Sequence, residues 1–319
     1  MPPPTILIIG ATGNTAIGVL ELLPSLLASS NTLQSHRILA VTRSLSSTIA
    51  QQRSQLPGIT LIEQNWVEID SAWLKSHSIT RIFIAPHIDP TAFVEESQLY
   101  VNALQAGVEY VVRVGTTAGN AKADSIVYHA RAHWALENLL SQPEFGRMGW
   151  TSLRPNCFNG MFLYSAVEFV RGFGEKEGKK GGVLSLPLAK DVGVGLMDAR
   201  DVGVFAAYLL AEEDPSRHHG RKYDISGPDD VTGEEIVRWV EECIGEEVKE
   251  VKFQDTSLID HVAAQSDYSK NIMMSIREAL HIAWNGECST SLISKDVLKI
   301  APPKGRAKDA FKAMLERPS

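Results

Sequence analysis

The sequence predicts an α/β protein, with a doubly wound parallel sheet of the Rossmann type followed by a smaller, mainly helical part. Short apolar runs rich in β-branched residues alternate with helical patterns through the first half of the chain. The runs are apolar throughout rather than alternately apolar and polar, which is typical of parallel strands buried on both faces. A glycine-rich turn joins the first run to the first helical pattern, as at the start of a Rossmann-type sheet.

Six apolar runs are expected to form the strands, and apolar residues at helical spacing mark the helices between them. The expected strands are residues 6–9, 37–42, 59–63, 81–85, 110–114 and 150–153. The expected helices cover residues 14–27 and the apolar stripes 93–104 and 132–139.

The later part of the chain has few strand patterns and longer helical ones. Helices are expected at residues 232–244, 257–267, 271–283 and 306–316. Asp230 or Thr232 is expected to cap the first of them, and Asp198 and Asp201 to cap a helix that starts near Ala199. We therefore expect a Rossmann domain over residues 1–155 and a substrate-binding part over 156–319, with some segments of the latter returning to the sheet.

The composition argues against several classes of protein. A formal net charge of −7 disfavours broad binding to nucleic acid or to anionic membrane surfaces. No apolar stretch approaches the about 20 residues that cross a bilayer, and no signal-type segment opens the chain. Cys157, Cys243 and Cys288 are far apart and odd in number, which fits neither a disulfide framework nor a metal site. We expect a cytoplasmic protein with a small-molecule substrate; the oligomeric state is left open.

The stretch GATGNTAIG, residues 10–18, predicts a phosphate-binding loop. A strand ends at Gly10, Gly13 follows in a tight turn, and a helix begins at Asn14. The free backbone N–H groups and the positive end of that helix would face a phosphate, and the glycines let the backbone approach closely. An ordinary strand–helix turn is the alternative interpretation.

The end of the second strand predicts which dinucleotide binds. Arg43 and Ser44 stand where an NAD-specific site carries Asp or Glu for the ribose hydroxyls. A carboxylate would repel a 2′-phosphate, whereas a guanidinium binds it through charge-assisted hydrogen bonds. We therefore expect NADP(H) as the cofactor, unless Arg43 is only a solvated loop charge.

Six segments together resemble the NmrA-like branch of the atypical short-chain dehydrogenases over nearly the whole chain. They are GATGNTA (10–16), TRS (42–44), YVVRVGTTAG (110–119), LRPNCFNGMF (153–162), MDARDVG (197–203) and YDISGPDDVTGEEI (223–236). The layout of the later part resembles the fungal festuclavine synthase and agroclavine dehydrogenase group, which acts on indole-alkaloid iminium intermediates.

The resemblance implies a set of cofactor contacts. Thr12, Gly13, Asn14 and Thr15 would meet the pyrophosphate, and Arg43 and Ser44 the 2′-phosphate. Pro86, His87, Gly115, Thr116 and Thr117 would line the ribose and nicotinamide, and Pro155, Asn156 and Phe158 would abut the nicotinamide. Ala16 replaces the third glycine of the family loop, a position where a small residue is tolerated.

The chain departs from the family on the helix after the fifth strand. Ordinary short-chain dehydrogenases place a Tyr and a Lys four residues apart there, but here His129 and His133 take those positions. The two histidines share one helix face and could move protons, with Tyr128 and Arg131 close by as hydrogen-bond donors. Alternatively both are structural polar residues. No third ligand accompanies the pair, so no metal is expected.

Several other residues have two interpretations each. Cys157 either faces the cofactor or is a small core residue. The loop 172–182 is either a lid or a plain surface loop. Trp66, Trp73, Trp134 and Trp284 either shape an aromatic substrate pocket or pack in the interior, and Glu287 is a possible substrate contact.

Three functions remain open from the sequence. The first is an NADPH-dependent reductase of an iminium or conjugated double bond in a small, indole-alkaloid-like specialised metabolite, with the hydride supplied by the cofactor. The second is a non-redox cyclase of the Pictet–Spengler type, in which the histidines shuttle protons and NADP is structural. The third is an NADP-sensing regulatory protein, which needs no proton donor.

Overall fold

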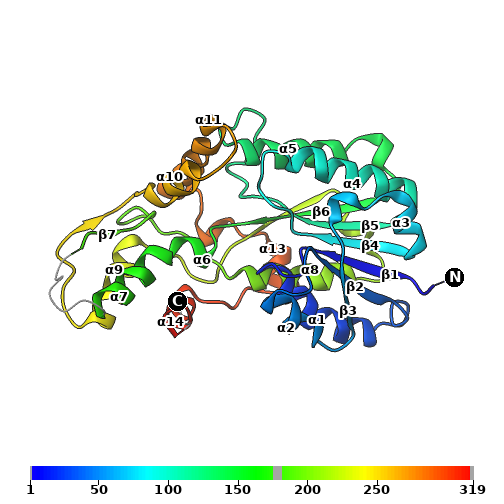
Figure 1. Cartoon of the computed structure of the whole chain (residues 1–319), viewed down its shortest axis with the longest axis horizontal. Helices are drawn as coiled ribbons and strands as arrows, with labels where there is room; N and C mark the ends of the chain where they lie inside the picture. The colour runs from blue at the N-terminus through cyan, green and yellow to red at the C-terminus, as the bar shows by residue number, and fades with distance from the viewer. Residues whose placement is uncertain (1, 175–181, 317–319) are drawn as a thin grey trace.

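A seven-stranded parallel sheet forms the centre of the computed structural model, which describes residues 2–174 and 182–316 (Figure 1). The strand order is β3-β2-β1-β4-β5-β6-β8, and each neighbouring pair is parallel. The strands are β1 (Thr5–Ile9), β2 (Arg37–Thr42), β3 (Ile59–Glu63), β4 (Ile79–Ile84), β5 (Tyr110–Val114), β6 (Gly149–Pro155) and β8 (Arg221–Ile225). The predicted Rossmann-type α/β fold is confirmed.

All six predicted strands are present, but β8 was not predicted. It begins with the exposed Arg221 and Lys222, so it lacks the continuous apolar run of the other strands. The reason is its place at the edge of the sheet, where one side has no neighbouring strand within the described chain. β8 is one of the segments that return to the sheet from the later part of the sequence.

Helices cover both faces of the sheet, and β1 shows how the faces are separated. Ile6 and Ile8 pack into a core with α1 (Ala16–Ala28) and α8 (Ala199–Ala211). Leu7 and Ile9 point the other way, into a core with α4 (Ala92–Ala106) and α5 (Tyr128–Leu140) (Figure 1). The alternation follows from the period of two along a strand.

α1 and α8 approach each other unusually closely, through two glycines. A Cβ atom on Gly18 would lie 2.1 Å from the carbonyl oxygen of Arg200, and one on Gly203 would lie 2.0 Å from that of Thr15. Any larger residue would push the helices apart. The contact between these two helices therefore depends on Gly18 and Gly203, while Ala16 is buried in the core.

The later part of the chain builds a third core with its own small sheet. β7 (Leu184–Ser185) pairs with β9 (Val251–Lys252), and α7 (Tyr164–Gly174), α9 (Gly233–Ile244) and α14 (Ala307–Glu316) pack around this third core. The remaining helices are α2 (Thr48–Ser54), α3 (Ser71–Ser76), α6 (Asn159–Phe162), α10 (Ser257–Ala264), α11 (Lys270–Met274), α12 (His281–Trp284) and α13 (Lys295–Ile300).

The single helix expected over residues 271–283 is wrong in this form. α11 ends at Met274, a 3₁₀ stretch covers Ser275–Leu280, and α12 follows. The two ends of the segment 271–283 pack in different clusters. Met273 packs against Tyr128, while Leu280 and Ile282 belong to the third core. In a straight α-helix Met273 and Leu280, seven residues apart, would lie on one face, whereas here they pack in different clusters.

The capping predictions are resolved by hydrogen bonds. Thr232 caps α9 in a capping box with Glu235, whereas Asp230 accepts from the backbone N–H of Thr290. Asp198 caps α8, and Asp201 accepts from two backbone N–H groups at Lys304 and Gly305. Most of the predicted loop 172–182 lies outside the described residues, and no helix in the described ranges is long and apolar enough to cross a membrane.

Candidate functional site

The glycine-rich loop opens onto a cavity at the carboxyl edge of the sheet, which we call the glycine-loop cavity. Its volume is about 450 Å³, and the ends of β1, β2, β3 and β4 contribute to its wall. The lining includes the predicted residues Gly10, Thr12, Gly13, Arg43, Pro86 and His87. This edge is where open α/β sheets bind their ligands.

The loop has the geometry of a phosphate cradle. Gly10 has φ +85°, and a Cβ atom there would lie 2.9 Å from the carbonyl oxygen of Ala85. Gly13 donates its N–H to Gly10 at 2.8 Å, which closes the turn. Within the described chain no side chain caps α1, so its first N–H groups are available to an anion. The loop therefore fits the diphosphate of a dinucleotide.

Three predicted contacts lie beside this cavity rather than in its lining. Asn14 is exposed, Thr15 is buried at the start of α1, and the hydroxyl of Ser44 bonds that of Ser46 at 2.8 Å. Arg43 is exposed at the cavity, and no hydrogen bond or ion pair engages its guanidinium within the described chain. Arg43 is thus free to meet a 2′-phosphate.

The sequence interpretation singled out Trp66 but missed the rest of the loop after β3 and one residue far along the chain. Gln64, Asn65 and Trp66 line the cavity, as does Tyr268 between α10 and α11. The loop after β3 could have been found, because the carboxyl ends of adjacent parallel strands share one edge. Tyr268 reaches the cavity through tertiary packing and left no local signal.

Glu95 and Asp89 hold His87 in the wall of the cavity. His87 Nε2 lies 2.5 Å from Glu95 Oε2, and Nδ1 accepts from the backbone N–H of Asp89 at 3.2 Å. Neither acid was singled out from the sequence. The pair fixes the ring of His87, which precedes Ile88 in the wall of the next cavity.

A second cavity, the histidine cavity, lies at the ends of β5 and β6 and has a volume of about 260 Å³. Its predicted lining residues are Gly115, Thr116, Thr117, His129, His133, Pro155, Asn156 and Phe158. Its unpredicted ones include Ile88, Asn120, Met161, Phe162, Ile259, Ile276, Leu280 and Ile282. The wall is mainly apolar with a few convergent polar groups, as in small-molecule sites.

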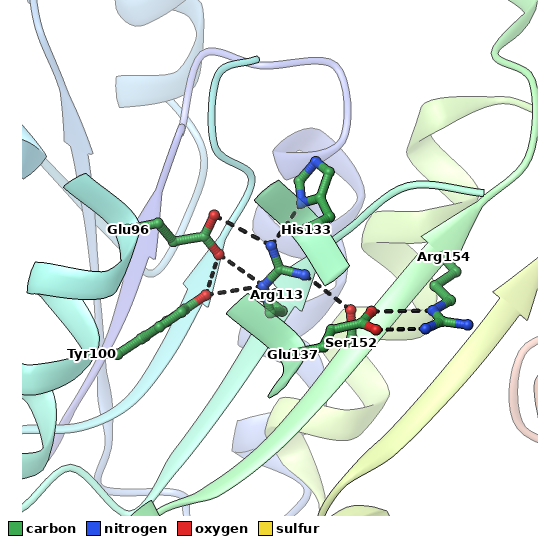
Figure 2. A network of polar contacts seen from close by, with 7 residues as sticks. All are labelled: Glu96, Tyr100, Arg113, His133, Glu137, Ser152 and Arg154. Carbon is green, nitrogen blue, oxygen red and sulfur yellow. Dashed lines mark hydrogen bonds and ion pairs between the residues drawn. The ribbon is translucent and has the colours of Figure 1, made fainter. Parts of the chain in front are cut away.

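His133 is held by a fully buried ion pair. Arg113 and Glu96 are 0% exposed and bond through two pairs of atoms, at 2.8 and 3.2 Å, while Tyr100 also donates to Glu96 (Figure 2). Arg113 Nη2 lies 2.7 Å from His133 Nδ1. An arginine can only donate, so Nδ1 accepts and the ring hydrogen sits on Nε2, which points away from the network (Figure 2).

Both histidines of the cavity are neutral at pH 7. Burial, the charge of Arg113 and His129 together hold the pKa of His133 well below its ordinary value. Burial also lowers the pKa of His129 to about 4. The cavity therefore offers a fixed N–H donor at His133 but no histidine that releases a proton near neutral pH.

The other two predicted catalytic side chains lie outside the lining of the histidine cavity. The Tyr128 hydroxyl donates to the carbonyl of Ile88 at 2.5 Å, and burial raises its pKa to about 12. Arg131 is exposed and donates to the carbonyls of Ser125 and Ile126. Both side chains hold loops in place, so only His129 and His133 remain as candidate catalytic residues.

Glu137, one turn beyond His133, fixes the helix against the sheet. It is fully buried and takes two hydrogen bonds from Arg154, at 3.1 and 2.5 Å (Figure 2). Lys222 Nζ on β8 lies 3.4 Å from the same carboxylate. Although burial works against the charge, the hydrogen bond from Arg154 keeps the pKa of Glu137 below its ordinary value. This anchor sets the position of His133 over Arg113.

The residues that had two interpretations from the sequence differ in which cavity they line. Cys157 lines the histidine cavity, and its hydrogen bond to Cys288, together with burial, raises its pKa well above the ordinary value, so it is a thiol rather than a thiolate. Trp66 lines the glycine-loop cavity, whereas Trp73, Trp134 and Trp284 line neither cavity. Glu287 lines a third cavity, described below.

The chain belongs to the NmrA-like family, whose model matches residues 3–290. The NAD(P)H azoreductase of Xenophilus azovorans is 27% identical over 173 residues. That match spans 54% of this chain and 54% of the azoreductase, about half of each.

Solved structures share the fold over nearly the whole chain. Citrobacter sp. triphenylmethane reductase complexed with NADP(H) has a TM-score of 0.69 at 19% identity, covering 98% of this chain and 100% of its own. An NADPH-dependent quinone oxidoreductase of Escherichia coli, complexed with NADPH, gives 0.71 at 20% identity over 98% and 100%. The negative transcriptional regulator NmrA in complex with NADP gives 0.63 at 14% over 98% and 91%. The same fold thus carries two reductases and a regulator.

Proposed function

We propose that the chain binds NADP(H) in the glycine-loop cavity and reduces a small cyclic metabolite in the histidine cavity. The bond reduced would be an iminium or a conjugated double bond. The observation that carries the proposal is the arrangement of the two cavities along one sheet edge, joined at the segment that contains His87 and Ile88. The NADP(H) and NADPH complexes of proteins with the same fold support the choice of cofactor.

Arg43 is the group on which the preference for NADP(H) over NAD(H) depends. Its guanidinium is exposed at the glycine-loop cavity, directly after β2, and can form charge-assisted hydrogen bonds with a 2′-phosphate. Gly10, Gly13 and the uncapped start of α1 would hold the diphosphate. When bound, the nicotinamide supplies the hydride.

The protonation state of the histidines favours one kind of hydride acceptor. Reduction of a ketone leaves an alkoxide, which needs a proton from the site. Hydride addition to an iminium gives a neutral amine, and a conjugated system spreads the negative charge over several atoms. Because His129 and His133 are neutral, the cavity suits these electron-poor acceptors better than a ketone. The indole-alkaloid chemistry implied by the resemblance to festuclavine synthase is one specific form of this proposal.

His133 would serve as a hydrogen-bond donor in place of the family lysine. Arg113 fixes its Nδ1 as an acceptor, so Nε2–H is available to a ribose hydroxyl or to the substrate. Such a donor works at any pH above the low pKa of the ring. His129, whose Nδ1 is buried without a partner in the described chain, would contribute shape and a polar contact.

An NADP-sensing regulator is the second candidate, because the cavity lacks the Tyr that donates a proton in ordinary short-chain dehydrogenases and the Lys that lowers the pKa of that Tyr. The enclosed apolar space beside His133 favours the reductase, since a sensor needs no substrate cavity. The cyclase has no observation in its favour: with the pKa of His129 at about 4, neither histidine is a proton shuttle at pH 7.

The experiment follows NADPH fluorescence while the chain is offered a panel of acceptors. The panel contains a dihydroisoquinolinium salt, a quinone, a triarylmethane dye and an azo dye. His133→Asn should lower kcat about tenfold or more, because it removes the fixed Nε2–H donor. An unchanged Kd for NADPH would assign this donor to the substrate, and a raised Kd would assign it to the ribose. Arg131→Ala, on the same helix but outside the cavity, is the matched control.

Each result decides between the candidates. Loss of NADPH in equal amount to reduced product supports the reductase. NADPH that binds but is never consumed, together with tighter binding of NADP+, would point to the sensor. Product that forms without NADPH loss would restore the cyclase.

A further inference from the structure

A third cavity adjoins the histidine cavity at the β6–β8 end of the sheet, and neither the proposed cofactor nor the hydride step uses it. We call it the edge cavity; its volume is about 350 Å³. Its lining includes Thr117, Gly119, Arg154, Asn156, Asp224, Ser226, Glu287, Cys288 and Leu292. Thr117 and Asn156 also line the histidine cavity, so these two residues form a shared wall.

Asn156 presents an unsatisfied acceptor in that shared wall. The side chain is 92% buried, since its exposed fraction is 8%. Its Nδ2 donates to the carbonyl of Cys288 at 2.6 Å, which fixes the orientation of the amide, and its Oδ1 has no partner within the described chain. The backbone N–H of Asn156 is held by Ile225 at 2.7 Å, so the side chain cannot swing away to find another donor.

Asp224 presents a second unsatisfied acceptor in the same cavity. Its backbone is tied to Ser294 through the hydroxyl and the N–H of that serine, but its buried Oδ1 has no partner in the described chain. Burial raises the pKa of Asp224, and the positive charge of Arg154 offsets that rise only in part. A buried acceptor left without a donor is costly.

One cation, Arg154, lines the same cavity. It gives Nε and Nη2 to Glu137 (Figure 2), and its charge acts to lower the pKa of Asp224. Lys222 Nζ also lies 3.4 Å from Glu137. Asp224 and the exposed Glu287 outnumber Arg154 among the charged residues of the lining, so the edge cavity keeps two unsatisfied acceptors and an excess of negative charge. A protonated amine satisfies both needs, because it carries a positive charge and up to three donors.

We infer that the edge cavity binds a protonated amine of the substrate, held by Asn156 Oδ1 and Asp224 Oδ1. The rest of the substrate would extend past Thr117 into the histidine cavity. This inference rests on the proposed function for the placement of the reacting bond, but amine binding itself is testable without any turnover. It narrows the substrate class to small cyclic molecules that carry a basic nitrogen outside the reduced bond.

The test uses three probes of one shape and different charge: benzylamine, benzyl alcohol and benzoate. Binding to the full chain is measured by titration calorimetry at pH 7, with and without saturating NADP+. We expect benzylamine to bind at least tenfold more tightly than the other two probes, and Asp224→Asn to remove that preference. The Kd for NADPH should stay the same in this variant.

Two further variants make the test specific. Asp229→Asn removes the same charge from the connection that follows β8, where Asp229 lies in a surface ion pair with Arg306, so this variant should bind benzylamine like the unchanged protein. Leu292→Arg places a cation on an exposed residue of the cavity lining, and it should weaken benzylamine binding without touching the core.

The outcomes separate this inference from the proposed function. Equal binding of benzylamine and benzyl alcohol, or equal binding of benzylamine by Asp224→Asn and the unchanged protein, would mean that the cavity does not recognise the ammonium group and would overturn the inference. A preference for benzoate would overturn it as well, in favour of Arg154 as an anion site. A failure to bind NADPH would count against the proposed function alone, because the probe titrations do not require the cofactor.

Discussion

The glycine-loop cavity and the histidine cavity lie at the same edge of one sheet but are built differently. The first is lined mainly by residues at or just after the ends of β1, β2, β3 and β4. The second gathers side chains from segments around residues 115–120, 129–133, 155–162 and 259–282. A cofactor site made of local backbone turns can be read from short motifs, whereas a substrate site made of distant side chains cannot.

The largest expected effect tests the buried network behind the histidine cavity. Arg113→Ala would leave Glu96 charged and unpaired in the interior, so we expect a loss of about 3–5 kcal/mol in the free energy of unfolding. Arg43→Ala, at the glycine-loop cavity, should cost almost nothing, since its side chain is exposed. Denaturant titration measures both values.

A double variant sharpens this prediction. Arg113→Met with Glu96→Gln removes both charges and should be less destabilising than Arg113→Ala alone, because no buried charge is left unpaired. Equal stability of Arg113→Ala and the unchanged protein would show that the network does not support the histidine cavity.

The next effect is a pH dependence that belongs to the histidine cavity. The pKa of His129 is lowered from 6.5 in the unfolded chain to about 4 in the fold, so the unfolded state binds more protons between these values. Stability should therefore fall as the pH drops from 6.5 to about 4, by on the order of 3 kcal/mol for this residue. His133 should add to the loss, because its pKa is lowered in the same direction.

Comparison of variants isolates the histidine contribution from that of the carboxylates. His129→Asn should flatten the fall in stability over this pH range, whereas His219→Asn, on an exposed residue, should not. The measurement is the free energy of unfolding at several pH values. An unchanged slope in His129→Asn would mean that the ring is not buried in solution.

A smaller effect belongs to the glycine-loop cavity and concerns binding rather than stability. Arg43→Ala should weaken NADPH binding by about 10- to 100-fold, the range expected for a lost charge-assisted contact, and leave NADH binding unchanged. Fluorescence titration with both cofactors measures this. Equal weakening for NADPH and NADH would assign Arg43 to the diphosphate instead of the 2′-phosphate.

The sheet and the cofactor loop could be predicted from the sequence because both leave local signals in it. Continuous apolar runs mark buried parallel strands, and the turn from Gly10 to Gly13 is read within four residues. β8 was missed because its charged start lies at the sheet edge. Arg113 was overlooked, although an arginine inside a buried apolar strand must have a partner, and that rule would have pointed to Glu96 and His133. Tyr268 and Leu280 reach their cavities only through tertiary packing, so no pattern could have named them.

The smallest expected effect concerns the edge cavity, which shares its wall with the histidine cavity. At pH 7 Asp224 carries a charge that Arg154 compensates only in part, so Asp224→Asn should raise the free energy of unfolding by about 1 kcal/mol. The sign of this stability change follows from the raised pKa of Asp224. The folded state binds more protons than the unfolded state, so the carboxyl of Asp224 lowers stability as the pH rises above the ordinary pKa of Asp. The gain should therefore vanish at a pH below the ordinary pKa of Asp, where the carboxyl is neutral in both states.

A carboxylate that destabilises the fold in the absence of a ligand is expected of a binding residue. An Asp224→Asn variant that is more stable but no longer binds benzylamine would therefore link the cost in stability to amine binding. If the variant were instead destabilised at pH 7, Asp224 would have a compensating partner in the fold, and its role in holding an amine would lose its physical basis.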